Sequence, residues 1–346
     1  MSINKSKRGE RQETKNLNRF VLLNNSKRGI EFSFAWLFAI IVGAMILFLA
    51  IYAAMGFIES SQDIEGTKAA KELTIIFNPL ETGLASGKSS IVNLNPEARI
   101  YNKCSVEESF GKQKFSISQK SGFKKEWPLP GGEISVYNKY VFSDEIEQGS
   151  KIYFFSKPFN MPFKVSELIF MSTKNYCFKD APEFIRDEII QLQIGNVKLE
   201  NCSSKEIQVC FGSSGAGCNI SVYGDCSGNC NSISGEYEFG HTVKNGKTVY
   251  HISSLIYGTI FSSVDIYNCN FKRLMMRIKQ ICYLYENEAN FLAARGCGNA
   301  IITNLIGLAN TAENAKSISS SSILMLKEAK DNLDLQNSKQ LGCGIY

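Results

Sequence analysis

The longest apolar stretch of the chain lies near its N-terminus and constrains the fold more than any other feature. No charged residue occurs from Phe32 to Ile58, a run of 27 residues. A helix of about 20 residues crosses the roughly 30 Å hydrocarbon core of a bilayer. Trp36 and Tyr52 stand near the two ends of the run, as aromatic residues do at membrane interfaces. Secretory signal peptides have apolar regions of only about 7–15 residues. The sequence therefore predicts a permanent transmembrane helix over residues 29–58.

The charges on the two sides of this run predict its orientation. Residues 1–28 contain eight Lys and Arg against two Glu, a net charge of +6. The whole chain carries +5 and Glu31 contributes −1, so residues 59–346 have no net charge. Basic segments stay on the cytoplasmic side of a membrane. We therefore expect a cytoplasmic tail over residues 1–28, the lipid bilayer as a partner, and the bulk of the chain outside the cytoplasm. The excess of positive charge in the whole chain comes from the tail, so no nucleic-acid partner is expected.

The eleven cysteines all follow the apolar run, beginning at Cys104. Disulfides form in oxidising compartments, so this one-sided distribution agrees with an extracytoplasmic location. Several cysteines recur at intervals of eight residues in a Gly-, Ser- and Asn-rich segment, which cannot order itself by burying apolar surface. Zinc binding is the alternative, but the spacing lacks the paired C-x₂-C of zinc ribbons. Disulfides are therefore favoured, and no metal is expected.

The cysteines divide into three groups. At least three bridges are expected among Cys104, Cys177, Cys202, Cys210, Cys218, Cys226 and Cys230. A second group, Cys269, Cys297 and Cys343, lies at helix ends or connections, where disulfides would tie the helices to each other or to a sheet. Cys282 lies in the middle of a helical pattern and is expected to be a buried free thiol, since an unpaired cysteine behaves as a small hydrophobe.

Beyond the apolar run, the pattern changes three times. Residues 59–78 continue as a stem helix with a loose apolar stripe, and Asn78-Pro79 is expected to end it. Residues 79–260 are rich in short β-branched and aromatic segments separated by turn residues, with one helix opened by Pro182. From residue 261 to 346 the apolar residues recur with the period of a helix. The stripe of the stem is Ile64, Leu73, Ile76 and Phe77.

These patterns predict an α+β fold. It consists of a single N-terminal transmembrane helix extended into a stem, a β-sandwich-like extracytoplasmic domain of antiparallel strands, and a C-terminal helical subdomain tied by disulfides. A hairpin is expected with Asn245-Gly246 at a type I′ turn. In the helical part, one side of the first helix should face the core. That side comprises Ile266, Leu274, Ile278, Ile281 and Tyr285.

Two motifs with possible chemistry do not fit a known site. Gly83–Ser90 resembles a phosphate-binding loop, but only three residues separate its glycines where four are required. No nucleotide is therefore expected. His241 and His251 flank the predicted hairpin, and strand pairing would bring them near each other. Without a catalytic spacing or a metal-binding motif around them, we interpret both as ordinary strand residues. The sequence assigns no catalytic residue and no cofactor.

Residues 27–31 carry the resemblance to a known family. Lys27-Arg28-Gly29 followed by Ile30, Glu31 and a long apolar helix resembles the class III signal of type IV pilins and TadE-like minor pilins. The resemblance implies cleavage after Gly29 by a prepilin peptidase, and packing of the apolar helix into a filament. In those families the glutamate is the fifth mature residue, whereas Glu31 would be the second. The rest of the chain resembles uncharacterised single-pass surface proteins of small-genome archaea.

The sequence favours a non-enzymatic, single-pass cell-surface protein with a structural, adhesive or binding role and pilin-like biogenesis. Its expected partners are the bilayer, further copies of itself or other surface proteins. The alternative is a membrane-tethered extracytoplasmic enzyme, such as an envelope hydrolase. A pocket with converging His, Asp or Ser side chains would favour this alternative.

Overall fold

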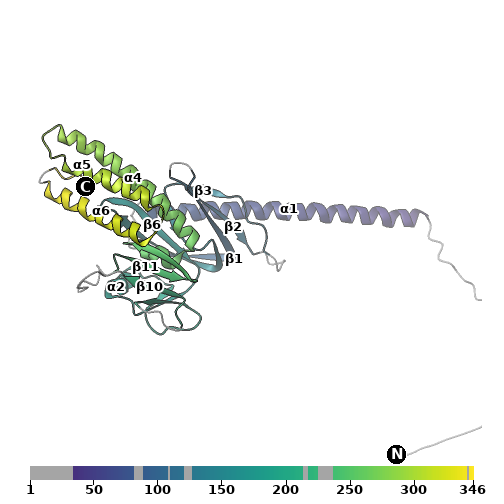
Figure 1. Cartoon of the computed structure of the whole chain (residues 1–346). Helices are drawn as coiled ribbons and strands as arrows, with labels where there is room; N and C mark the ends of the chain where they lie inside the picture. Colours follow the sequence, from purple (N-terminus) through teal and green to yellow (C-terminus); the bar gives the residue numbers. More distant parts are fainter. Residues whose placement is uncertain are drawn as a thin grey trace, which may run out of the picture. The chain divides into compact units, whose positions relative to one another are not determined.

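The structure is a computed structural model in which the chain forms one long helix, two mixed sheets and a layer of helices (Figure 1). It describes residues 34–81, 89–107, 110–120, 127–212, 217–224, 237–340 and 343–346. The chain divides into two units, Met1–Gly56 and Phe57–Tyr346. We call Phe57–Tyr346 the head, and each unit is described by itself.

In the first unit, the described residues belong to helix α1 (Phe34–Glu81). Nearly all side chains from residue 34 to 56 are exposed, although the segment is apolar throughout. Phe34 is 83% exposed and Phe48 is 68% exposed. The helix is long and apolar enough to cross a membrane. The predicted apolar helix is therefore confirmed for these residues, while residues 1–33 lie outside the described part of the chain.

Sheet A has six strands in the order β3-β2-β1-β5-β6-β4. They are β1 (Ser89–Ser105), β2 (Lys112–Gln119), β3 (Ile134–Val136), β4 (Tyr140–Phe142), β5 (Ile146–Asn160) and β6 (Lys164–Ser172). All neighbouring pairs are antiparallel except β4 and β6, which run parallel.

Sheet B also has six strands, in the order β12-β11-β10-β9-β7-β8. They are β7 (Tyr176–Lys179), β8 (Val197–Lys198), β9 (Ile207–Phe211), β10 (Ile220–Gly224), β11 (Phe239–Lys244) and β12 (Lys247–Ile252). The predicted hairpin is confirmed: β11 and β12 are antiparallel, and Asn245 and Gly246 have φ of 52° and 72°. The pairs of β7 with β8 and β9, and of β9 with β10, are parallel.

The expectation of an antiparallel sandwich is therefore wrong in its details. Parallel pairs need crossovers, and helix α2 (Glu183–Leu192), which follows Pro182 as predicted, lies between β7 and β8 in the chain. Helix α3 (Leu255–Phe261) connects the cores of the two sheets. The ring of Phe261 lies 5.2 Å from that of Phe155 in sheet A and 4.6 Å from that of Tyr176 in sheet B. A helix thus occupies a position where a sandwich would have direct contact between sheets.

Within the head, the last part of α1 packs on sheet A and forms a separate core with it. The helical residues buried there are Ala70, Leu73, Phe77 and Leu80. Ile76 packs against this core, but Ile64 is 66% exposed and does not belong to the stripe. The helix also continues through Pro79 to Glu81, although Asn78-Pro79 was expected to end it. Burial of Phe77 and Leu80 against the sheet outweighs the unfavourable effect of the proline.

Two glycines allow α1 to approach the loop before β3 closely. A Cβ on Gly66 would lie 2.5 Å from the carbonyl oxygen of Ile117, and one on Gly131 would lie 2.4 Å from the backbone nitrogen of Thr67. The backbone N–H of Gly132 donates to Thr67 Oγ1 at 2.7 Å. Gly66, which weakens an isolated helix, is therefore explained by backbone packing within the head.

The C-terminal part of the head is a layer of helices, α4 (Val264–Ala293), α5 (Ala300–Ala315) and α6 (Ser320–Lys339). They lie side by side (Figure 1), with α4 packed on sheet A and α6 on sheet B. Ser263 Oγ caps α4 by accepting from Ile266 N, and Ser319 caps α6 in a capping box. The predicted apolar side of α4 is confirmed: Ile266, Leu274 and Ile278 are buried, and Ile281 and Tyr285 pack against the same core.

Candidate functional site

A cavity with a volume of about 390 Å³ lies at the N-terminus of α4 and is lined by several charged side chains. Loops and strand ends from both sheets contribute to it. Asp144 comes from the β4–β5 loop, Lys174 from the β6–β7 loop and Lys244 from the end of β11. Segments that lie far apart in the sequence therefore place charged side chains in one hollow.

Asp144 is the centre of the charges in this cavity. Its carboxylate forms an ion pair with Lys174, and its other oxygen lies 3.9 Å from Lys244 Nζ. Burial acts to lower the pKa of Lys174, but the hydrogen bond and charge of Asp144 outweigh it and raise that pKa. Burial lowers the pKa of Lys244, and Asp144 opposes the shift only in part. Lys244 also donates to the carbonyls of Ile260 and Ser262, at 3.1 and 3.0 Å.

A second carboxyl lies next to Asp144. Glu147 is fully buried, and burial raises its pKa despite the hydrogen bonds that it accepts. Its Oε2 accepts from the backbone N and the Oγ1 of Thr173 at 2.8 and 2.6 Å, and its Oε1 accepts from Asp144 N at 3.3 Å. Glu147 therefore holds the β4–β5 loop to the β6–β7 loop, and so fixes the positions of Asp144 and Lys174.

A second hollow, of about 360 Å³, lies beside the first. The two share Asp265 at the start of α4. The second is lined by Tyr101, by exposed Ile146 and by Glu145, which follows Asp144 in the chain. Tyr101 and Ile146 are partners in the β1–β5 register and therefore share one face of the sheet. Together the two hollows extend across the N-terminal turn of α4.

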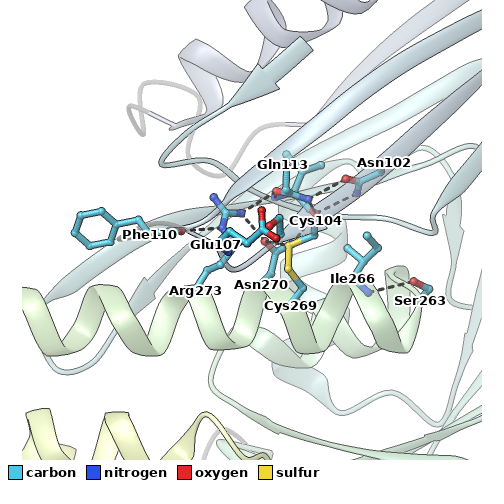
Figure 2. The surroundings of a disulfide bond; sticks show 12 residues. Asn102, Cys104, Glu107, Phe110, Gln113, Ser263, Ile266, Cys269, Asn270 and Arg273 are labelled. Atoms are coloured by element: carbon cyan, nitrogen blue, oxygen red, sulfur yellow. Dashed lines mark hydrogen bonds between the residues drawn. A yellow bond between two sulfur atoms is a disulfide. The ribbon is translucent and has the colours of Figure 1, made fainter. Parts of the chain in front are cut away.

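Further along α4, a buried arginine joins this helix to sheet A (Figure 2). Arg273 is fully buried, and burial lowers its pKa to about 10. Its guanidinium donates to Asn270 Oδ1 at 2.8 Å, to Gln113 Oε1 at 3.3 Å and to the carbonyls of Phe110 and Lys139 at 3.0 Å each. The acceptors outside α4, in residues 110–113 and at Lys139, thus hold the helix in place.

The disulfides described in the head span from 8 to 165 residues of sequence. The bonded pairs are Cys104–Cys269, Cys177–Cys202, Cys210–Cys218 and Cys297–Cys343. Two of these bonds belong to the group in which at least three were expected, but Cys104 instead pairs with a cysteine of α4. Cys226 and Cys230 lie outside the described residues. Cys282 is a buried free thiol, as predicted, and burial raises its pKa to about 12.

The two histidines lie on neighbouring strands in different surroundings. His241 in β11 stacks on Tyr223 with the ring centres 4.8 Å apart. His251 in β12 is fully buried. It pairs with Gly240, the residue before His241 in β11, so the two histidines are not direct partners. Neither ring nitrogen of His251 has a hydrogen-bond partner among the described residues. Among the described residues, no group of three His, Cys, Asp or Glu side chains could hold a metal ion.

Acidification should destabilise the head through His251. Burial, with a smaller contribution from the charge of His241, lowers the pKa of His251 to about 3. An unfolded chain would protonate this group near pH 6.5, so its contribution to stability is present above that pH and is lost as the pH falls. Between pH 7 and pH 4 the loss should be about 3 kcal/mol. Urea unfolding of the wild type and of His251→Leu at both pH values measures it.

His241→Leu is the matched control, because it removes the neighbouring histidine but leaves His251 in place. The His251→Leu variant should lose about 3 kcal/mol less than the wild type over this pH range, while His241→Leu should keep most of the loss. Equal losses in all three proteins would contradict the assignment.

The proposed processing residues Gly29, Ile30 and Glu31 lie outside the described residues, as does most of the glycine-rich loop that begins at Gly83. The sequence did not indicate the cavity. Asp144, Lys174 and Lys244 form no motif, and only the pairing of strands brings them together.

No family model, curated protein or solved structure matches the chain. Function is therefore inferred from the residues and their geometry alone.

Proposed function

We propose that the protein is a single-pass membrane protein whose head lies outside the cytoplasm and has a structural, adhesive or binding role. The combination of four disulfides among the described residues of the head with an apolar helical segment whose side chains are exposed carries this proposal. Structural disulfides persist in oxidising compartments. An exposed apolar helix of this length is stable in a bilayer, where lipid covers its side chains.

A binding role fits the cavity at α4 better than catalysis does. Ser263 is the one hydroxyl side chain that lines the larger hollow, and its Oγ already caps α4. No histidine lines either hollow in the described part of the chain, and Cys104 is in a disulfide. Hydrolysis by a side-chain nucleophile requires a nucleophile and a base within hydrogen-bond reach. Asp144 and Asp265 also line the larger hollow, as the enzymatic alternative would require, but Asp144 is paired with Lys174 and Ser263 caps the helix, so these surroundings favour recognition over hydrolysis.

Labelling of intact cells with a membrane-impermeant amine reagent tests the topology. Exposed head lysines such as Lys205, Lys272 and Lys339 should be modified, because they should face the outside of the cell. The lysines of residues 1–28 should be modified only after the cells are opened, and so serve as an internal control. Mass spectrometry identifies the modified residues. Labelling of residues 1–28 in intact cells, with an unlabelled head, would overturn the proposed topology.

The resemblance of Lys27-Arg28-Gly29 to a class III signal supports a narrower form of this proposal, in which a peptidase cuts between Gly29 and Ile30. Such a cut would remove the basic residues and leave a helix that is apolar nearly from its start. The N-terminal peptide from the same labelled sample tests this step. A mature N-terminus at Ile30 supports pilin-like processing, and an N-terminus at Met1 or Ser2 means a plain anchor.

A further inference from the structure

The two hollows at the N-terminus of α4 are neighbours, and we call them together the groove. They share Asp265, and each contains members of the segments 144–146 and 264–266. Their volumes, about 390 and 360 Å³, each lie in the range of small-molecule sites. An elongated ligand with repeated units would fill this groove better than a single compact molecule.

Several side chains of the groove have hydrogen-bonding groups that the fold does not use. Lys247, Asn245 and Asp265 are exposed and have no hydrogen bond or ion pair with any described residue. Asn219 uses its Oδ1 to accept from Gln208 N at 2.8 Å, which leaves its amide N–H groups available. The unused set thus includes an ammonium, two amides and a carboxylate, and it can both donate and accept.

The charges of the groove do not favour a simple anion. Lys174 is paired with Asp144, and Lys244 is engaged by two carbonyl oxygens. The remaining ammonium of Lys247 shares the larger hollow with the carboxylate of Asp265. A ligand that both donates and accepts hydrogen bonds therefore fits better than one that only accepts. Sugar hydroxyls have this property, since each has one donor and two acceptor sites.

The second hollow offers a complementary surface. The Tyr101 ring and the exposed Ile146 side chain lie on one face and provide an apolar patch beside the polar groups. The C–H faces of sugar rings pack on aromatic surfaces of this kind. A peptide would use a free strand edge. Strands β10 and β11, which border the larger hollow, are paired on both sides, and the edge strand β12 reaches this hollow only through its first residue, Lys247.

We propose that this groove binds a glycan chain, with sugar hydroxyls in the larger hollow and a ring face against Tyr101 and Ile146. The proposal rests on the proposed function, because a head outside the cytoplasm meets extracellular polysaccharides. It names the class of ligand that the adhesive or binding role would involve.

Binding of the full chain in detergent micelles to an array of dextran, mannan, xylan, alginate and hyaluronate tests this assignment. The wild type should bind at least one of these probes. Lys247→Ala and Asp265→Ala should each weaken that binding by about 2- to 10-fold, because each removes a hydrogen bond to the ligand. Both side chains are exposed, and circular dichroism verifies that each variant is folded.

Lys339→Ala is the matched control, since Lys339 is exposed near the bond Cys297–Cys343. That bond lies just past the end of α4, which has 30 residues and therefore places this lysine roughly 45 Å from the groove. This variant should bind as the wild type does. Binding to none of the five probes would overturn the proposal, as would equal binding by the groove variants. Competition by denatured casein, which identifies a peptide site, would also overturn it.

The outcome can be separated from that of the topology experiment. A head that is labelled outside intact cells but binds no probe overturns the glycan site alone. A head that binds a probe through Lys247 and Asp265 but is unlabelled in intact cells overturns the extracytoplasmic location and keeps the site.

Discussion

Replacing Cys104 and Cys269 together by alanine should lower the free energy of unfolding of the head by about 5 kcal/mol. The bond joins β1 to α4 across a sequence separation of 165 residues. A cross-link stabilises mainly by restricting the unfolded chain, and the chain-entropy estimate for a loop of this length is about 5 kcal/mol. The bond also lies next to Asn270 and Arg273, which hold the same turn of α4 to sheet A (Figure 2).

The Cys210–Cys218 pair provides the matched control. Its separation is only 8 residues, for which the same estimate gives about 2.5 kcal/mol. Urea unfolding of the full chain in detergent, followed by near-ultraviolet circular dichroism, should give a loss about twice as large for the Cys104/Cys269 variant. Equal losses would mean that loop length does not determine the contribution of these bonds.

Phe77→Ala should cost the head about 3–5 kcal/mol, the usual range for deleting a buried aromatic side chain. Phe77 is fully buried between α1 and sheet A. Its ring lies 5.3 Å from that of Phe115 and 6.1 Å from that of Phe154. Truncation would leave a cavity between a helix and a sheet that cannot close, because the backbones already meet at Gly66 and Gly131.

Ile75→Ala tests whether the loss comes from packing on the sheet. Ile75 lies two residues away on the same helix but is 55% exposed. Its truncation should change the free energy of unfolding by about 0.5 kcal/mol or less. Thermal unfolding of the two variants beside the wild type measures both effects. A small loss for Phe77→Ala would mean that the end of α1 is not part of the folded core of the head.

The elements that follow from local pattern could be predicted. The apolar helix, the hairpin at Asn245-Gly246, the helix after Pro182 and the inward side of α4 each depend on periodicity or turn chemistry within one segment. The burial of Cys282 followed from the same helical pattern. The extension of α1 through Pro79 did not follow, because it depends on the sheet that buries Phe77 and Leu80.

Features that depend on long-range pairing could not be predicted. The partner of Cys104 lies in a helix far along the chain, and the number of possible pairings among eleven cysteines leaves it open. The parallel pairs of β7, β8 and β9 depend on a crossover that local propensity does not specify. The cavity at α4 depends on long-range pairing within both sheets, because Asp144, Lys174 and Lys244 meet only when sheets A and B are in place.

The pairing of Cys104 with Cys269 has a consequence for biosynthesis. Ribosomes make the chain from its N-terminus, so Cys177 follows Cys104 after 73 residues, and five more cysteines emerge before Cys269. Each of them is available as a wrong partner before the correct one exists. Cys104 must therefore remain reduced or exchange partners during maturation, and a thiol–disulfide isomerase should raise the yield of the native protein.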